Sequence, residues 1–405
     1  MAALHGRQRP VDRGWQVGLA FGALLGLAVG IIGQRARRAA RGGGLVDWGQ
    51  AEQIAVERLR RSPGALPAHE LRAAGPAYAS AMARIVPLLE DHLGQPLPGV
   101  VERHEVVDRA GWARANLGTF RQLIGRLEND LLRPDGEPTV GESIAHLANR
   151  FITTRQIAFL LSYLGSRVLG QYDVALLSAE GSPGRLLFVE ENIRTTAAAL
   201  GVPPDDFRVW ICLHETTHAF ELEGHPWLRR YLAERLERQL AAFAREAQAL
   251  QVEGLARLVR AFRRGEDGHF LEGFLGTEQR RLLAETQRVM SLLEGFSDWV
   301  MDEAGHELIE DIPLIRARFE ARRNQRRKGL DRLIARLTGL DLKIEQYRRG
   351  ERFVAGVAAA GGRHAVARLW QGPEALPSEE EMSDPVAWLR RVAPGTVAAP
   401  GARPA

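Results

Sequence analysis

The sequence predicts a mainly α-helical fold with a small antiparallel β-sheet (α+β), preceded by one N-terminal transmembrane helix. Apolar residues recur with a period of about 3.6 over most of the chain, which is typical of amphipathic helices. One pair of short apolar runs flanks a turn rich in glycine and proline, and this pattern predicts a hairpin. Strands and helices do not alternate, so a parallel βαβ sheet is not expected.

The composition is that of a globular protein and excludes several classes of function. Hydrophobic residues at 45% and charged residues at 26% exclude wholesale disorder. A net charge of +4 over 405 residues gives little support for nucleic-acid binding, so no nucleic-acid partner is expected. The single cysteine, Cys212, excludes an internal disulfide and any multi-cysteine metal site, and we expect it to pack in the core.

An uncharged segment at residues 15–34 follows an N-terminal tail at 1–14 and is long enough to cross a bilayer as a helix. Arginines follow at once where a signal peptide would have small residues, so we expect a retained single-pass anchor rather than a signal peptide or a buried soluble helix. The positive-inside rule and the lone cysteine favour a cytoplasmic main body. Glycines at every fourth position form a stripe of small residues on this helix: Gly18, Gly22, Gly26 and Gly30. A second helix could pack closely against this stripe, and a homo-oligomer is one possible result.

A basic, glycine-rich linker at 35–45 leads into one predicted unit over 46–393, and residues 394–405 are expected to form a disordered tail. The first part of this unit predicts four helices and one short strand. The helices cover 47–61, 76–93, 112–132 and 144–169, and the strand covers 100–107. The hairpin follows, with strands at 171–178 and 185–193. Beyond residue 204 helix follows helix, with breaks at 225–226, 265–268 and 339.

The motif HExxH lies in a predicted helix over about 205–224, which begins near Pro203 with an aspartate available as a cap. Residues four apart share one helix face, so His214 and His218 can bind one tetrahedral metal ion. Glu215 then lies beside the open position of the metal and can act as general base. A chance match on a glutamate-rich surface helix is the alternative, and the apolar character of this helix disfavours it.

Two histidines leave one protein ligand to be found. Glu294 lies among apolar residues in a predicted helix over about 280–303, and a carboxylate in that position needs a partner such as a metal. An ordinary hydrogen-bonded glutamate is the alternative, and Asp302 and Glu303 on the next turn are rival ligands. The segment from Glu294 to Asp298 is similar to the ExxSD pattern of thermolysin-like proteases, which implies that Asp298 orients His214.

Other features have weaker signals. The strand at 185–193 either offers an edge above the metal for a substrate backbone or only covers the metal helix. A group that stabilises the transition state is expected, and residue type alone suggests Tyr347 and His225, followed by Tyr172, Arg348 and His364. The basic run at 322–328 has no aromatic residues between its charges, so a solvated helix face or a position near lipid headgroups is favoured over a nucleic-acid site.

The chain resembles the zincin-like metallopeptidase family often labelled as associated with deazaflavin-cofactor biosynthesis. The resemblance rests on blocks at 46–48, 107–116, 168–173, 214–221, 292–302, 339–354 and 369–392. It implies a zincin-type unit with extra helices, zinc on His214, His218 and Glu294, and Glu215 as the base. Members often have a histidine where this chain has Phe296, and this departure bears on catalytic competence.

These features together predict a membrane-anchored, zinc-dependent hydrolase. We expect a metallopeptidase that uses zinc-activated water with a glutamate general base on a peptide or protein substrate. Hydrolysis of a non-peptide amide is a variant of the same chemistry. The alternative from another class is a catalytically inactive, zinc-stabilised scaffold or regulatory protein.

Overall fold

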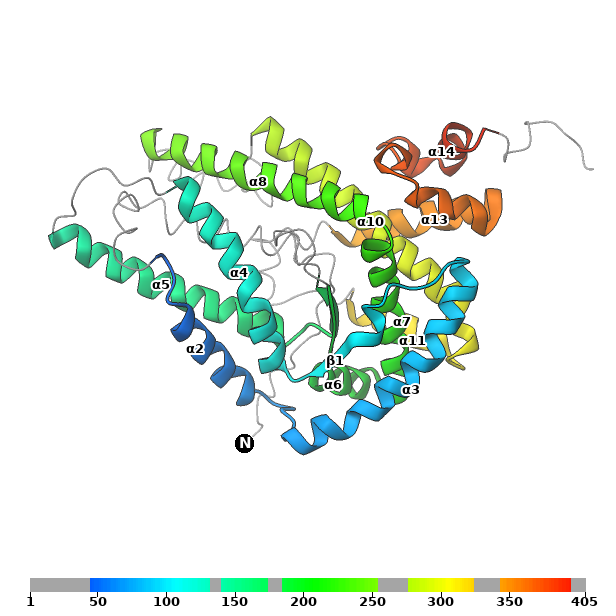
Figure 1. The fold of residues 1–405 in the computed structure, drawn as a ribbon, viewed down its shortest axis with the longest axis horizontal. Helices are drawn as coiled ribbons and strands as arrows, with labels where there is room; N and C mark the ends of the chain where they lie inside the picture. The colour runs from blue at the N-terminus through cyan, green and yellow to red at the C-terminus, as the bar shows by residue number, and fades with distance from the viewer. Residues whose placement is uncertain (1–43, 132–139, 174–183, 254–275, 324–342, 395–405) are drawn as a thin grey trace, which may run out of the picture.

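A computed structural model describes residues 44–131, 140–173, 184–253, 276–323 and 343–394 (Figure 1). The described part is mainly helical, as predicted. Its helices are α2 (Trp48–Arg60), α3 (Ala68–Leu93), α4 (Arg109–Leu131), α5 (Val140–Gly165), α6 (Glu190–Leu200), α7 (Pro204–Glu223), α8 (Pro226–Glu253), α10 (Thr277–Ala304), α11 (Ile312–Arg323), α13 (Lys343–Val366) and α14 (Pro385–Val392). Short 3₁₀ turns cover Val101–Arg103, Gly305–Glu307, Ala367–Trp370, Pro373–Ala375 and Glu381–Ser383.

Several predicted features lie outside the described residues. They include the transmembrane helix at 15–34 with its glycine stripe, the breaks at 265–268 and 339, and most of the basic run at 322–328. Within the described segments, none of the helices combines the length and the apolar character that crossing a bilayer requires.

In the described part of the chain the sheet has three strands, β1 (His104–Val107), β2 (Gly170–Asp173) and β3 (Arg185–Val189), in the order β1-β3-β2. β2 and β3 are antiparallel, but β1 and β3 are parallel, so the prediction of a purely antiparallel sheet is wrong. The connection through α4 and α5 leads into β2, which runs opposite to β1, and the reversal of direction between β2 and β3 then makes β3 parallel to β1. β3 therefore occupies the centre, and β2 forms one edge.

The strand predicted over 185–193 ends at Val189, and the next residues open α6. Glu190 and Glu191 lie in the first turn of that helix, where the helix dipole favours acidic side chains, and both are buried. Glu191 accepts hydrogen bonds from the backbone N–H groups of Leu66 (2.7 Å) and Arg109 (2.9 Å). The sequence at 190–193 therefore predicts a strand, but hydrogen bonds from distant segments stabilise a helix start there.

α3 begins eight residues earlier than the predicted helix at 76–93, although Pro76 lies inside it. A proline removes one backbone hydrogen bond and usually marks a helix start in sequence. Here Ala74 and Tyr78 are both buried on either side of Pro76, and this packing holds the helix continuous.

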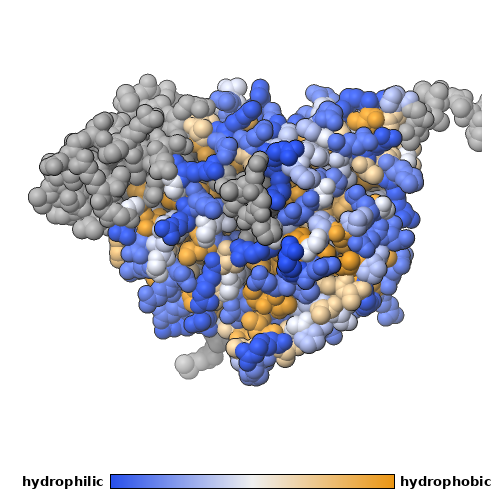
Figure 2. All heavy atoms as spheres, viewed as in Figure 1, coloured by the Kyte–Doolittle hydropathy of each residue, from blue (hydrophilic) through white to orange (hydrophobic). Residues whose placement is uncertain are grey.

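The core has two main regions, which lie on either side of the sheet in Figure 1. α2, α4 and α5 form one helical group, and α3, α7, α10, α13 and α14 form the larger group, which includes the HExxH helix α7. α8 packs against both, with Leu228 and Leu232 in the larger group and Leu236 and Leu240 in the smaller one. Polar side chains cover most of the face seen in Figure 2, with smaller apolar areas between them. Within the larger group, α10 and α13 approach closely at Gly295 and Gly350, where an added Cβ would lie 2.3 and 1.8 Å from the opposing backbone.

Candidate metal centre

The HExxH residues lie on α7, in the interior of the larger helical group. All residues from Phe207 to Leu222 are buried, which identifies α7 as a core helix rather than a surface one. Pro203 occupies the N-cap position and Pro204 the first turn, whose fixed φ suits a helix start. The predicted aspartate cap is wrong, because the N-cap residue is Pro203, and Asp205 and Asp206 lie inside the first turn. Gly224 ends the helix.

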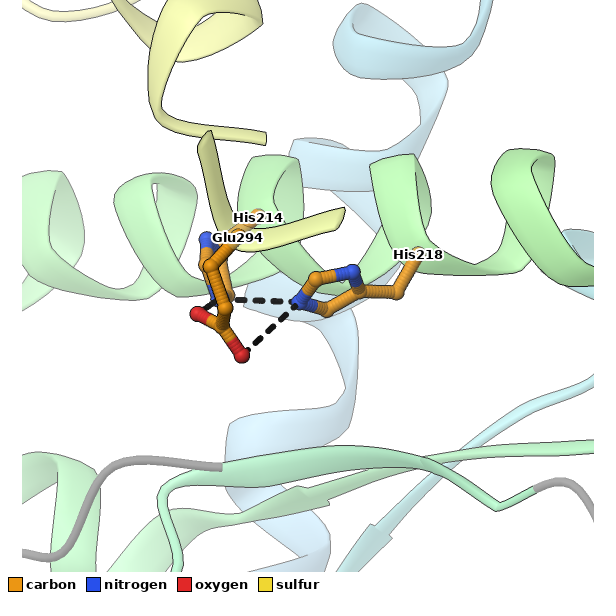
Figure 3. A group of neighbouring side chains, drawn as sticks. All are labelled: His214, His218 and Glu294. Carbon is orange, nitrogen blue, oxygen red and sulfur yellow. Dashed lines mark hydrogen bonds and ion pairs between the residues drawn. The ribbon is translucent and has the colours of Figure 1, made fainter. Parts of the chain in front are cut away.

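Three side chains converge between α7 and α10 (Figure 3). The Nε2 atoms of His214 and His218 are 3.2 Å apart. The Glu294 carboxylate comes from α10, with Oε2 3.8 Å from Nε2 of His214 and Oε1 4.0 Å from Nε2 of His218. The three residues are only 6–8% exposed, so the group is buried but not sealed.

The geometry and chemistry of this group fit zinc. Tetrahedral zinc with ligand bonds of 2.0–2.2 Å needs ligand atoms roughly 3.3–3.5 Å apart. The separations of 3.2 to 4.0 Å bracket that value. Two imidazole nitrogens and one carboxylate oxygen are a typical zinc donor set, and three protein ligands leave a fourth position for water, as in catalytic rather than structural sites.

Glu215 is fully buried beside this group and contacts the sheet. Its Oε2 accepts a hydrogen bond from the backbone N–H of Tyr172 at 3.1 Å. Tyr172 lies on the edge strand β2, so the strand that contacts Glu215 is β2, although β3, at the predicted 185–193, also contacts α7. β3 is paired on both sides and offers no open edge.

His218 is held through its second ring nitrogen. Nδ1 lies 2.6 Å from Oε2 of Glu221, three residues further along α7, and 3.2 Å from Oγ of Ser297 on α10. The sequence analysis missed both contacts. The available signal was the spacing from His218 to Glu221, which puts the two residues on one helix face.

A family model described as a zincin-like metallopeptidase matches residues 46–389. The chain belongs to this zincin-like metallopeptidase family. A crystal structure from Chloroflexus aurantiacus, described as "a putative hydrolase with a novel fold", is 37% identical, with 86% of this chain and 98% of that chain covered and a TM-score of 0.61. No curated protein matches the chain. The association with deazaflavin-cofactor biosynthesis stays a prediction.

Three further acidic residues of α10 lie along the helix beyond Glu294. Asp302 is exposed and pairs with Arg316, and Glu303 is exposed, so neither belongs to the buried three-residue group. Asp298 is half-buried, one turn beyond Glu294. Burial lowers the pKa of Arg316, but attraction to Asp298 and Asp302 outweighs it and raises that pKa overall.

The candidates for transition-state stabilisation come from several elements of the fold. His225 stacks on Trp370 with ring centroids 5.2 Å apart, and burial lowers its pKa. Tyr172 donates its hydroxyl to Glu223, and His364 is exposed on α13. Tyr347 and Arg348 belong to the first turns of α13, and their side chains lie outside the described residues.

Phe296 lies in an aromatic cluster of the hydrophobic core. Its ring is 4.8 Å from Trp370, 5.8 Å from Trp299 and 6.0 Å from Phe220, and the residue is 2% exposed. The three metal-binding candidates converge without this position. The departure from the family pattern therefore changes core packing and removes none of the three.

Proposed function

We propose that the chain is a zinc-dependent metallopeptidase that uses Glu215 as general base. The convergence of His214, His218 and Glu294 beside the buried Glu215 is the observation that supports this proposal. When bound, zinc supplies a Lewis acid that activates water and polarises a carbonyl group. Glu215 accepts the proton of the attacking water and passes it to the leaving amine.

The contacts around Glu215 support its assignment as the base. The N–H of Tyr172 fixes one carboxylate oxygen, which limits the rotamers of Glu215. Asp298 is proposed to orient His214 from the turn of α10 that follows Glu294. Tyr347 and His225 remain the proposed groups for stabilising the transition state.

We propose a peptide or protein substrate that adds to the outer edge of β2. The N–H of Val189 donates to the carbonyl oxygen of Leu169, so the polar backbone groups of Leu169 face β3. These groups alternate in direction along an antiparallel strand, so the N–H and C=O groups of Gly170 and Tyr172 face away from β3. Because the N–H of Tyr172 is held by Glu215, substrate pairing would use the carbonyl oxygens of Gly170 and Tyr172.

Cleavage of a fluorogenic peptide library by the zinc-loaded full chain tests the reaction. We expect activity in the wild type and a loss of about 100- to 10,000-fold in Glu215→Gln, because the base is removed while its shape is kept. Asp206→Asn, an equivalent change in the first turn of the same helix, should keep wild-type activity. A zinc-loaded protein that cleaves nothing, or a Glu215→Gln variant as active as the wild type, would favour the inactive scaffold instead.

We also propose that residues 15–34 anchor the chain in a membrane, with the main body in the cytoplasm and pairing through the glycine stripe. The described chain enters the fold against α5, where the Asp47 N–H donates to Oγ of Thr154 at 2.9 Å and Arg150 pairs with Asp47 at 3.5 Å. The linker at 35–45 would therefore join the anchor to the smaller helical group. Resistance of the full chain to alkaline carbonate extraction tests the anchor, and full extraction would refute it.

A further inference from the structure

We propose that Glu221 is a positioning residue for the metal site, which holds the imidazole of His218 with Nε2 directed at His214 and Glu294. Ser297 is its helper from α10. The inference rests on the zinc site proposed above and adds to it two residues whose side chains are not among the proposed metal ligands.

The two ring nitrogens of His218 face different partners. Nε2 lies 3.2 Å from Nε2 of His214 and 4.0 Å from Oε1 of Glu294. Nδ1 lies 2.6 Å from the carboxylate of Glu221. An ionised carboxylate only accepts hydrogen bonds, so ionised Glu221 would hold the imidazole proton on Nδ1 and leave the lone pair of Nε2 for a metal ion.

The surroundings of Glu221 differ from those of a structural buried carboxylate in the same protein. Glu190 on α6 is also fully buried, and its oxygens accept from Arg208, Arg194 and Tyr78. Within the described part of the chain, the ion pair found for Glu221 is with His218. Burying a carboxylate is costly unless a partner compensates, so a purely structural role gives this glutamate little benefit.

Ser297 ties the same nitrogen to the helix that carries Glu294. Its Oγ lies 3.2 Å from Nδ1 of His218, and Ser297 and Glu294 are one turn apart on α10. α10 thus supplies one proposed ligand and supports a second one. This contact therefore links α7 to α10 at the site.

The test compares zinc affinity and the visible spectrum of the cobalt-loaded form in full-length variants. Glu221→Ala should lower zinc affinity about 10- to 100-fold and shift the cobalt bands, because the orientation and basicity of His218 change. Glu221→Gln should fall between it and the wild type, since the amide oxygen still accepts the hydrogen bond. Ser297→Ala should show a smaller loss than Glu221→Ala.

Glu191→Gln is the matched control, because it alters another buried carboxylate that bonds backbone N–H groups away from the metal. It should lower thermal stability while zinc affinity and the cobalt spectrum stay at wild-type values. Wild-type affinity and spectrum in Glu221→Gln and in a folded Glu221→Ala would overturn the inference. An affinity loss in Glu191→Gln as large as in Glu221→Ala would also overturn it.

Glu294→Ala separates this inference from the proposed function. If the wild type binds zinc and Glu294→Ala does not, the metal site stands whatever the result at Glu221. If the wild type binds no zinc, both the proposed site and the role of Glu221 are wrong.

Discussion

Replacing Gly295 with alanine should force α13 away from α10 next to a proposed metal ligand. A Cβ at Gly295 would lie 2.3 Å from the carbonyl carbon of Gly350 and 2.5 Å from the backbone nitrogen of Glu351. Both are backbone atoms, so no side chain can rotate away. Ordinary carbon contacts begin near 3.5 Å, and the helices must therefore separate by about 1 Å.

The free energy of this change has two parts. Overpacking a close contact costs about 1–3 kcal/mol, and a clash with backbone belongs at the upper end. Alanine in a helix interior recovers up to about 1 kcal/mol relative to glycine. We expect a net loss of about 2 kcal/mol in the free energy of unfolding.

Urea denaturation followed by tryptophan fluorescence measures this loss, and zinc binding should weaken as well because Glu294 precedes Gly295. Gly118→Ala in α4 is the matched control, since an added Cβ there meets no atom of the described residues within 4 Å. It should be neutral or stabilising by up to about 1 kcal/mol. Wild-type stability in Gly295→Ala, or an equal loss in Gly118→Ala, would refute the packing argument.

Three further predictions concern the core and the metal. Glu190→Gln should cost about 3–5 kcal/mol, because Arg208 loses a buried carboxylate. Burial raises the pKa of Glu190, but hydrogen bonds from Arg208 and its neighbours outweigh it and hold that pKa below its usual range. This stabilisation is present above the unfolded-state pKa of about 4.3 and is lost as pH falls through the lower folded value, so urea midpoints should fall more steeply below pH 4 in the wild type than in Glu190→Gln. Phe296→His should lower the melting temperature but leave zinc content unchanged by mass spectrometry, because the ring packs in the aromatic cluster. Zinc at 100 times its Kd should stabilise the wild type by about 2.7 kcal/mol, seen as a rise in melting temperature that EDTA reverses and that Glu294→Ala lacks.

The metal helix could be predicted from sequence because its signals are local. The HExxH spacing, the prolines before it and the glycine after it all act within one helix. Glu294 could be singled out because a carboxylate among apolar neighbours conflicts with its surroundings unless it has a partner. Mainly helical content followed from periodicity alone.

The features that could not be predicted depend on contacts between distant segments. The parallel pairing of β1 with β3 joins residues about eighty positions apart, such as His104 with Leu186. Glu190 starts a helix because Tyr78 and Arg208 reach it from α3 and α7. The spacing in the sequence puts Glu221 on one helix face with His218, but the burial of its carboxylate beside Nδ1 depends on the packing of the whole fold.

An anomalous diffraction experiment at the zinc edge, on crystals grown with zinc, tests the proposed metal site directly. We expect one strong peak bonded to Nε2 of His214, Nε2 of His218 and a carboxylate oxygen of Glu294, at about 2.0–2.2 Å from each. No peak between α7 and α10, or a peak not bonded to Glu294, would refute the proposed zinc site.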